Sequence, residues 1–188
     1  MDVAGLVLAA GAGRRFGMPK ALVAYQGRLL VRRAVDTLRA AGCAQTLVVL
    51  GAAAERVRSE APDLPETVVN ADWASGMGSS LRAGLAGLAD GVAEAAVVLL
   101  VDMPGVTAEA VQRVLAEAGP GALMMGGYEG RRGHPVLLGR HHWAGVAASA
   151  TGDRGARDYL RAHAAEVRVV PVGDVADDSD IDTPADLG

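Results

Sequence analysis

The sequence predicts an α/β fold in which a mostly parallel sheet is flanked by helices, and three observations support this prediction. Short apolar runs alternate with segments of helical periodicity along the chain. Residues 95–101 are apolar throughout, as in a parallel strand that is buried on both faces. The 188 residues suffice for one hydrophobic core but not for two, so we expect a single domain over residues 1–188.

Strand and helix signals follow one another through the first half of the chain. Apolar or β-branched runs predict three strands, at residues 3–9, 46–50 and 66–70. Apolar positions at helical spacing between Val31 and Leu38 predict a first helix, which Gly42 ends. We expect the next helix to begin with Ser79 or Ser80 as its N-cap.

The second half continues the alternation after the central strand at residues 95–101. Thr107 is the expected N-cap of a helix that ends before Gly119. The remaining predicted elements are two strands within residues 122–139, a helix at 153–163 and a strand at 167–172. Parallel strands joined by right-handed crossovers bind ligands beyond their carboxyl ends. The expected architecture is therefore Rossmann-like, with its site on the loops that follow the strands.

Composition and charge exclude several classes of protein. The net charge of −4 and the absence of a basic stripe exclude binding to a nucleic-acid backbone. No apolar run is long enough to span a bilayer, and we expect no signal peptide. The single cysteine, Cys43, is interpreted as a small buried hydrophobe, and His141, His142 and His163 as surface residues without metal spacing. We therefore expect a cytoplasmic protein that binds neither nucleic acid nor membrane.

The glycine-rich segment at residues 11–20 follows the first strand and matches neither common phosphate-binding motif. A P-loop requires G-x-x-x-x-G-K-[ST], whereas Lys20 follows no glycine and precedes Ala21. A dinucleotide fingerprint needs its third glycine where Phe16 stands. The segment is instead a longer loop, whose backbone N–H groups and the cations Arg14 and Lys20 are suited to surround a polyphosphate.

The same segment, LAAGAGRRFGMPKAL, resembles the L-x-A-G-x-G-x-R-[FM]-G-x-x-K signature of the MobA-like nucleotidyltransferases. Proteins of this family transfer a nucleoside monophosphate from a nucleoside triphosphate, and their fold is of the nucleotide-diphospho-sugar transferase type. The resemblance covers nearly the whole chain and implies catalytic roles for Arg14, Lys20 and Asp102. The implied nucleotide-binding positions in the loop are Leu8, Ala9, Ala10, Gly11, Gly13, Arg14 and Lys20.

Two acidic elements resemble the metal-binding part of that family. The D-M-P element at Asp102 follows the central strand, and the resemblance implies that Asp102 contacts both the nucleotide and a metal. The terminal DIDTPADL is similar to D-[IV]-[DN]-T-P-E-D-L, which implies Asp182, with Asp180 beside it, as further ligands. Asp186 is assigned to the last turn. The expected cofactor is Mg²⁺ or Mn²⁺, because Mg²⁺ takes one or two carboxylates together with substrate phosphates.

The segment NADWASGMGSSL, which begins at Asn70, resembles an element of the molybdenum-cofactor cytidylyltransferase branch of the family. The guanylyltransferase branch usually differs at the serine pair, so the resemblance favours CTP over GTP. It implies nucleotide contacts from Asn70, Gly78, Ser79 and Ser80. Whether Trp73 packs or stacks on the base stays open.

Two further elements imply an acceptor site. RRGHPVLLG and TGDRGARDYL are similar to the G-H-P-[VA]-[LF] and G-D-x-G-[AG]-R elements of the same branch. The implied acceptor-binding residues are His134, Asp153 and Arg154. His134 is expected in a turn that faces the acceptor, Asp153 at the start of a helix, and Arg154 on an acceptor phosphate. Ala21 and the residues after it depart from close relatives, which leaves the acceptor itself open.

The resemblance implies that the terminal phosphate of molybdopterin attacks the α-phosphate of CTP and releases pyrophosphate. Guanylyl transfer to the same acceptor, or nucleotidyl transfer to another phosphorylated acceptor, is a first alternative. A second is an NAD(P)H-dependent oxidoreductase of the nicotine-blue type, which the failed G-x-G-x-x-G match disfavours. The third is a non-catalytic chaperone that delivers the cofactor, and the transferase too could contact a molybdoenzyme transiently.

Overall fold

The computed structural model describes all residues, 1–188, as one α/β domain around a seven-stranded sheet. The strands lie in the order β5-β4-β1-β6-β8-β7-β9. Their bounds are β1 Val3–Ala9, β4 Gln45–Leu50, β5 Glu66–Val69, β6 Ala95–Leu100, β7 Leu123–Tyr128, β8 Arg131–Gly139 and β9 Val167–Pro171. β1, β4, β5 and β6 pair in parallel, β8 is antiparallel to β6 and β7, and β9 is parallel to β7. The predicted mostly parallel sheet is confirmed.

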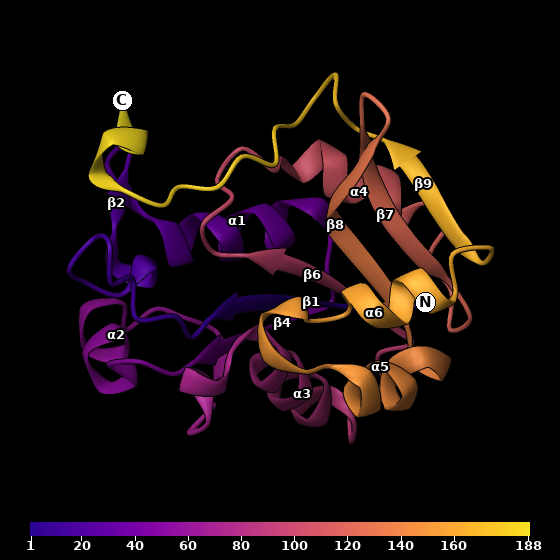
Figure 1. Cartoon of the computed structure of the whole chain (residues 1–188), viewed down its shortest axis with the longest axis horizontal. Coiled ribbons are helices and arrows are strands. Elements are labelled where there is room, and N and C mark those ends of the chain that lie inside the picture. Colours follow the sequence, from indigo (N-terminus) through magenta and orange to yellow (C-terminus); the bar gives the residue numbers. More distant parts are fainter.

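Helices cover both faces of this sheet (Figure 1). Their bounds are α1 Leu30–Ala41, α2 Ala54–Glu60, α3 Met77–Leu88, α4 Ala108–Leu115, α5 Trp143–Ser149 and α6 Arg157–Ala162. α1 and α4 pack on one face, while α3, α5 and α6 pack on the other. Alternate residues of β1 enter the two cores, with Val7 on the α1 side and Leu6 and Leu8 on the α3 side. β1 is therefore buried on both faces, as its apolar sequence predicts.

The shorter elements are a hairpin, β2 Ala24–Tyr25 with β3 Arg28–Leu29, and five 3₁₀ turns. The turns are η1 Lys20–Leu22, η2 Trp73–Ser75, η3 Arg140–His142, η4 Gly152–Arg154 and η5 Pro184–Leu187. The hairpin, α2 and α5 are absent from the sequence-based prediction. Thr107 is confirmed as the N-cap of α4, since its side chain accepts a hydrogen bond from the Ala110 N–H.

Three predicted element positions are wrong. α3 begins at Met77 after Gly76, so Ser79 and Ser80 lie inside the helix and are buried. Gly76 has φ of 115°, a conformation that favours glycine and turns the chain into the helix early. Asp153 does not cap α6, because η4 and a tight turn intervene before that helix begins. His134 lies within strand β8, and the turn between the two strands is formed by the residues around Gly130.

The histidine prediction is also corrected in part. His142 is buried, with Nδ1 2.8 Å from the Tyr159 hydroxyl and Nε2 3.1 Å from the Gly121 carbonyl. His163 is half-buried and stacks on Tyr159, whereas His141 is exposed as expected. These contacts depend on the packing of α6 against α5, which spacing along the chain does not reveal. None of the helices combines the length and the apolar composition that a membrane span requires.

The last fifteen residues form a strap that runs along the carboxyl edge of the sheet (Figure 1). The strap begins after β9 and ends in η5, and Ile181 is its one buried side chain beyond residue 173. The Ile181 N–H donates to the Asp102 carbonyl at 2.8 Å. η5 is closed by a capping box between Thr183 and Asp186, which confirms that Asp186 serves the last turn. The strap therefore brings the terminal acidic segment to the end of β6.

Candidate active site

One ammonium group joins the two predicted metal-binding segments. Lys20 is the only lysine in a chain that carries 18 lysine and arginine residues. Its Nζ donates to Asp102 Oδ2 at 2.9 Å and to Asp182 Oδ1 at 2.7 Å. A compact ammonium has three donors and fits between two carboxylates where the wider guanidinium plane of arginine does not. The structure thus unites three of the predicted residues from three distant parts of the chain.

The glycine loop after β1 folds so that Lys20 reaches this position. The N–H groups of Phe16 and Gly17 both donate to the Gly13 carbonyl, which makes a tight turn. Gly13 has φ of 61°, and a Cβ there would overlap the Met18 carbonyl oxygen. The loop then enters η1 instead of a long helix. This geometry agrees with the failure of the P-loop and dinucleotide patterns.

Two different constraints hold the carboxylates. Asp102 follows β6, where the Val101 N–H donates to the Leu8 carbonyl and ties the strand end to β1. Asp182 lies on the strap, and its N–H donates to Asp186 Oδ2 at 2.9 Å. Each carboxylate therefore has a fixed backbone, and the two approach each other only because the strap crosses the end of β6.

The charges of this cluster shift two pKa values. Burial lowers the pKa of Lys20, but the hydrogen bonds that it donates to Asp182 and Asp102, with the charges of these carboxylates, outweigh burial, so the net pKa is raised. The pKa of Asp180 is raised, first by burial and then by the charges of Asp102 and Asp182. Lys20 is consequently protonated at neutral pH, while Asp180 lies in a field of negative charge and makes no ion pair.

The residues fit a divalent cation that is shared with a phosphate ligand. No group of three or more His, Cys, Asp or Glu side chains is arranged to hold a metal by protein ligands alone. Asp102 and Asp182 converge on one positive charge, and Mg²⁺ binds through one or two carboxylates plus phosphates and water. Lys20 lies between these two carboxylates and would have to give way to the ion.

Two adjoining cavities lie at this site. The smaller one contains Lys20 in its lining and has a volume of about 400 Å³. It is lined by the glycine loop, the η2 turn, the start of α3 and the end of β6. Predicted nucleotide-binding residues that line it are Leu8, Ala10, Gly11, Gly13, Arg14, Lys20, Ser80 and Asp102. The half-buried Trp73 also lines this smaller cavity. Arg14 is exposed at its rim, without a carboxylate partner.

Four predicted nucleotide-binding residues lie outside this lining: Ala9, Asn70, Gly78 and Ser79. The Ala9 side chain belongs to the core on the opposite face of β1. The buried Asn70 amide donates to the hydroxyls of Ser79 and Ser80, at 2.8 and 3.0 Å, and accepts the Asp72 N–H. Gly78 lies against the backbone of residues 150–151, where a Cβ would not fit. These residues support the wall of the cavity from behind.

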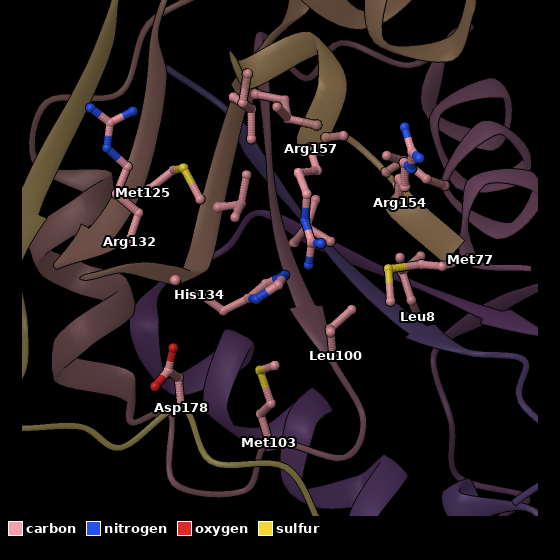
Figure 2. A pocket seen from close by; sticks show the side chains of 18 of the residues that line it. Leu8, Met77, Leu100, Met103, Met125, Arg132, His134, Arg154, Arg157 and Asp178 are labelled. Atoms are coloured by element: carbon pink, nitrogen blue, oxygen red, sulfur yellow. The ribbon is translucent and has the colours of Figure 1, made fainter. Parts of the chain in front are cut away.

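The larger cavity has a volume of about 670 Å³ and meets the smaller one at a shared boundary. Five residues line both: Leu8, Met77, Leu100, Asp102 and Asp153. Figure 2 shows the His134 ring pointing into this larger cavity, with Met77, Met103 and Met125 around it. Burial lowers the pKa of His134 to about 4, against the opposing charges of Asp102 and Asp178. The imidazole is therefore neutral at pH 7, and none of its ring atoms hydrogen-bonds within the protein.

Arginines surround the mouth of the larger cavity, and sequence reasoning selected only one of them. Arg154 is exposed and pairs with Asp158 at 3.2 Å. Arg157 extends into the cavity in Figure 2, and neither it nor Arg161 has a carboxylate partner. Arg157 is the final residue of the G-D-x-G-[AG]-R element, so that motif contained the missed signal. Arg161, one helical turn later, carries no motif of its own.

The arrangement is chemically suited to join two ligands. The smaller cavity offers a cationic loop next to two carboxylates, as a polyphosphate with a divalent cation requires. The larger cavity offers an apolar floor and a cationic rim, and both cavities open at Asp102.

Comparison with known proteins agrees with this geometry. The chain is 40% identical to a protein named nicotine blue oxidoreductase from Paenarthrobacter nicotinovorans, over 96% of this chain and 92% of that protein. It is 36% identical to a probable molybdenum cofactor guanylyltransferase from Opitutus terrae, over 56% of this chain and 50% of that protein. The crystal structure of Rv0371c from Mycobacterium tuberculosis superposes with a TM-score of 0.84 at 30% identity, covering 99% of this chain and 95% of the other. A manganese complex of Rv0371c superposes with a TM-score of 0.79 at 31% identity, covering 96% and 94%.

A family model for the MobA-like NTP transferase domain matches residues 5–167, which include the glycine loop, Asp102, α6 and the lining of the larger cavity apart from Asp178 and Asp180. The match spans most of the chain and agrees with the sheet order and with the loop that leads to Lys20. On this evidence the chain belongs to the MobA-like NTP transferase family.

Proposed function

We propose that this protein transfers a nucleoside monophosphate from a nucleoside triphosphate to a phosphorylated acceptor, with CTP as donor and molybdopterin as acceptor. One observation carries the proposal: two cavities meet at Asp102, and Lys20 stands at that junction with the two carboxylates. The cationic loop on one side is suited to a triphosphate, and the larger cavity on the other side leaves room for the acceptor.

In this reaction an oxygen of the acceptor phosphate attacks the α-phosphorus of the triphosphate. The bond between the α-phosphorus and the bridging oxygen breaks, and pyrophosphate leaves with the bonding electrons. Positioning and charge neutralisation supply most of the catalysis in such transfers. Arg14 and Lys20, beside the triphosphate in the smaller cavity, would stabilise the charge that builds on the leaving pyrophosphate.

The cofactor in this proposal is Mg²⁺ or Mn²⁺, held by Asp102 and Asp182 with Asp180 nearby. The bound ion would neutralise charge on the α-phosphate and on the pyrophosphate. The convergence of the two carboxylates supports this assignment, and a manganese complex of the similar protein Rv0371c agrees with it.

The choice of CTP and molybdopterin rests on a resemblance and on the relatives. The serine pair and Asn70, joined by hydrogen bonds behind the smaller cavity, resemble the cytidylyltransferase branch. Relatives named as molybdenum cofactor guanylyltransferases support the same acceptor with a different base. GTP is therefore the alternative donor.

The test is a screen for pyrophosphate release with CTP, GTP, ATP and UTP, each with molybdopterin as the phosphorylated acceptor and Mg²⁺ or Mn²⁺. We expect release with CTP and a loss of two to three orders of magnitude in Asp102→Ala, about the loss that follows removal of one group stabilising a transition-state charge. Near-normal turnover in that variant would refute the assignment. Tight binding of molybdopterin without pyrophosphate release would indicate a chaperone for a molybdoenzyme instead.

A second candidate is NAD(P)H-dependent reduction of a planar heteroaromatic compound. The 40% identity to a protein named nicotine blue oxidoreductase, over nearly the full length of both chains, favours it. The nicotinamide would deliver a hydride to the acceptor, which takes a proton from water. The loop after β1 leads into η1 and not into a dinucleotide-binding helix, which disfavours this candidate. Titration with NADH and NADPH tests it, and the absence of binding would eliminate it.

A further inference from the structure

The arginines of the larger cavity differ in whether their charge is already neutralised. Arg131 pairs with Asp178 at 3.0 Å and Arg154 pairs with Asp158 at 3.2 Å. Three further arginines line the same cavity with side chains that make no hydrogen bond or ion pair within the protein: Arg132, Arg157 and Arg161. Arg132 lies on β8 and points away from the His134 ring in Figure 2, whereas Arg157 and Arg161 lie on α6. A guanidinium without a partner on a cavity wall is available to a ligand.

These two arginines lie on one side of a helix without a compensating charge. Arg157 and Arg161 are four residues apart in α6, so they lie on the same face with a rise of about 6 Å between them. Asp158, between them in sequence, is turned toward Arg154. Like charges at this spacing repel by a few tenths of a kcal/mol in an isolated helix. A bound anion would remove that repulsion.

The pair belongs to the larger cavity alone. Asp102 and Asp153 line both cavities and mark the boundary, whereas Arg157 and Arg161 line only the larger one. Figure 2 shows Arg157 extending into the cavity above His134 and Leu100, with Met77 and Leu8 to one side. An acceptor phosphate at the boundary would use Lys20 and the carboxylate-held cation, which leaves the α6 pair for another group.

Apolar side chains form the floor of this cavity. They come from the central strands, from α3 and from α6: Leu81, Val98, Val136, Leu138 and Leu160. A polyol chain would find few hydrogen-bond partners on that floor, while a flat apolar body would bury against it. The lining of the cavity therefore combines the carboxylate of Asp102, an apolar floor and the two cations of α6.

We propose that Arg157 and Arg161 form a second anion-binding subsite, which holds a negatively charged group of the acceptor at the end opposite its reacting phosphate. The inference rests on the proposed function, since it takes the attacking phosphate to lie at Asp102. It defines the acceptor class as a molecule with two anionic ends joined by an apolar, flat body. A phosphorylated polyol with one anionic group does not belong to this class.

The first experiment measures binding of a probe anion directly. Molybdate, a tetrahedral dianion, is titrated calorimetrically into protein whose smaller cavity is filled with Mg²⁺ and a CTP analogue that cannot be cleaved between the α- and β-phosphates. We expect Arg157→Gln with Arg161→Gln to weaken molybdate binding by about tenfold or more, which corresponds to the loss of charge-assisted hydrogen bonds. The matched control Arg113→Gln, which removes an arginine that lines neither cavity and is paired with Asp174, stays within about twofold of the unsubstituted protein.

The second experiment reads the kinetic parameters of nucleotidyl transfer. Removal of a remote binding contact raises the KM for the acceptor and leaves kcat nearly unchanged, so we expect this split in the double variant. Both arginines are exposed, and equal thermal unfolding of variant and unsubstituted protein checks that the fold is intact.

Each outcome bears on the proposal. Absence of molybdate binding, or binding that is lost in Lys20→Gln and retained in the double variant, overturns the second subsite. Turnover with an unchanged KM in the double variant also overturns it. Loss of molybdate binding in the double variant, in a protein that releases no pyrophosphate from any triphosphate, supports the subsite and refutes the proposed function. The two failures are thus distinguishable.

Discussion

Replacing Lys20 with alanine removes the ammonium that joins Asp102 to Asp182, and we expect opposite effects on metal binding and on turnover. Without the lysine, the two carboxylates face each other with no positive charge between them. Mn²⁺ no longer has to displace an ammonium, so its affinity for the protein without nucleotide should rise. Turnover should fall by about two to three orders of magnitude, since the charge beside the leaving pyrophosphate is lost.

The expected gain in Mn²⁺ affinity follows from the two contacts of Lys20, with Asp102 and with Asp182. A fully shielded hydrogen bond between charged groups contributes about 1.5–3 kcal/mol. The side chains of Lys20, Asp102 and Asp182 are 19%, 20% and 44% exposed, so solvent screening reduces each contact to about 0.5–1 kcal/mol. The sum of about 1–2 kcal/mol corresponds to Mn²⁺ binding that is about 5- to 30-fold tighter in Lys20→Ala.

Titration of Mn²⁺ followed by electron paramagnetic resonance measures this affinity without any substrate. Arg14→Ala is the matched control, because it removes a positive charge of the same loop that contacts neither carboxylate, and it should bind Mn²⁺ much as the unsubstituted protein does. An Mn²⁺ affinity in Lys20→Ala that is equal to or weaker than that of the unsubstituted protein would refute the reasoning. It would mean that the ion does not compete with Lys20 for the two carboxylates.

Three further predictions concern the loop, the support of the smaller cavity and the acceptor cavity. Gly13→Ala should lower the free energy of unfolding by about 1–3 kcal/mol and abolish pyrophosphate release, because the new Cβ would overlap the Met18 carbonyl oxygen. Gly17→Ala is the control, since Gly17 has φ of 74° and open space around it. Chemical denaturation should show a loss of only about 1 kcal/mol for this variant. Asn70→Ala removes two buried hydrogen bonds to serine hydroxyls, so it should lower the free energy of unfolding by about 1–3 kcal/mol and raise the KM for CTP. An unchanged KM would contradict the role of Asn70 in supporting the smaller cavity. The depressed pKa of His134, about 4 against an ordinary 6.5, means that the unfolded state binds more protons between these values, so stability falls as pH falls from about 6.5 to about 4. His134→Gln should flatten that part of the profile of unfolding free energy against pH, and a profile of unchanged slope would contradict the assignment.

The success of the fold prediction has a local cause. β1 and β6 are apolar at every position, which indicates burial on both faces before any partner is known. α1 and α4 show apolar residues at helical spacing and end or begin at recognisable caps. α2 and α5 lack these signals: α2 starts after Ala53 in a left-handed conformation, and α5 consists largely of small apolar residues without a polar face.

The candidate site, like the fold, has a part that the sequence predicted and a part that it did not. The glycine loop, Asp102 and the acidic end of the chain are contiguous motifs, so the sequence alone indicated a phosphate-binding loop and a set of acidic residues. Their meeting through Lys20 depends on the strap that carries Asp182 across the end of β6, more than 70 residues later. Motif spacing contains no information about such a crossing.

Periodicity and motif spacing are local properties of the chain, so the sequence was enough to predict a mostly parallel α/β sheet and a polyphosphate loop after its first strand. Which charges are already neutralised depends on how the folded chain packs. Arg131 and Arg132 are neighbours in the sequence and chemically identical, yet Asp178 of the strap pairs with Arg131, while Arg132 has no carboxylate partner. A side chain becomes available to a ligand when packing leaves it without a partner, and packing joins residues that are distant in sequence.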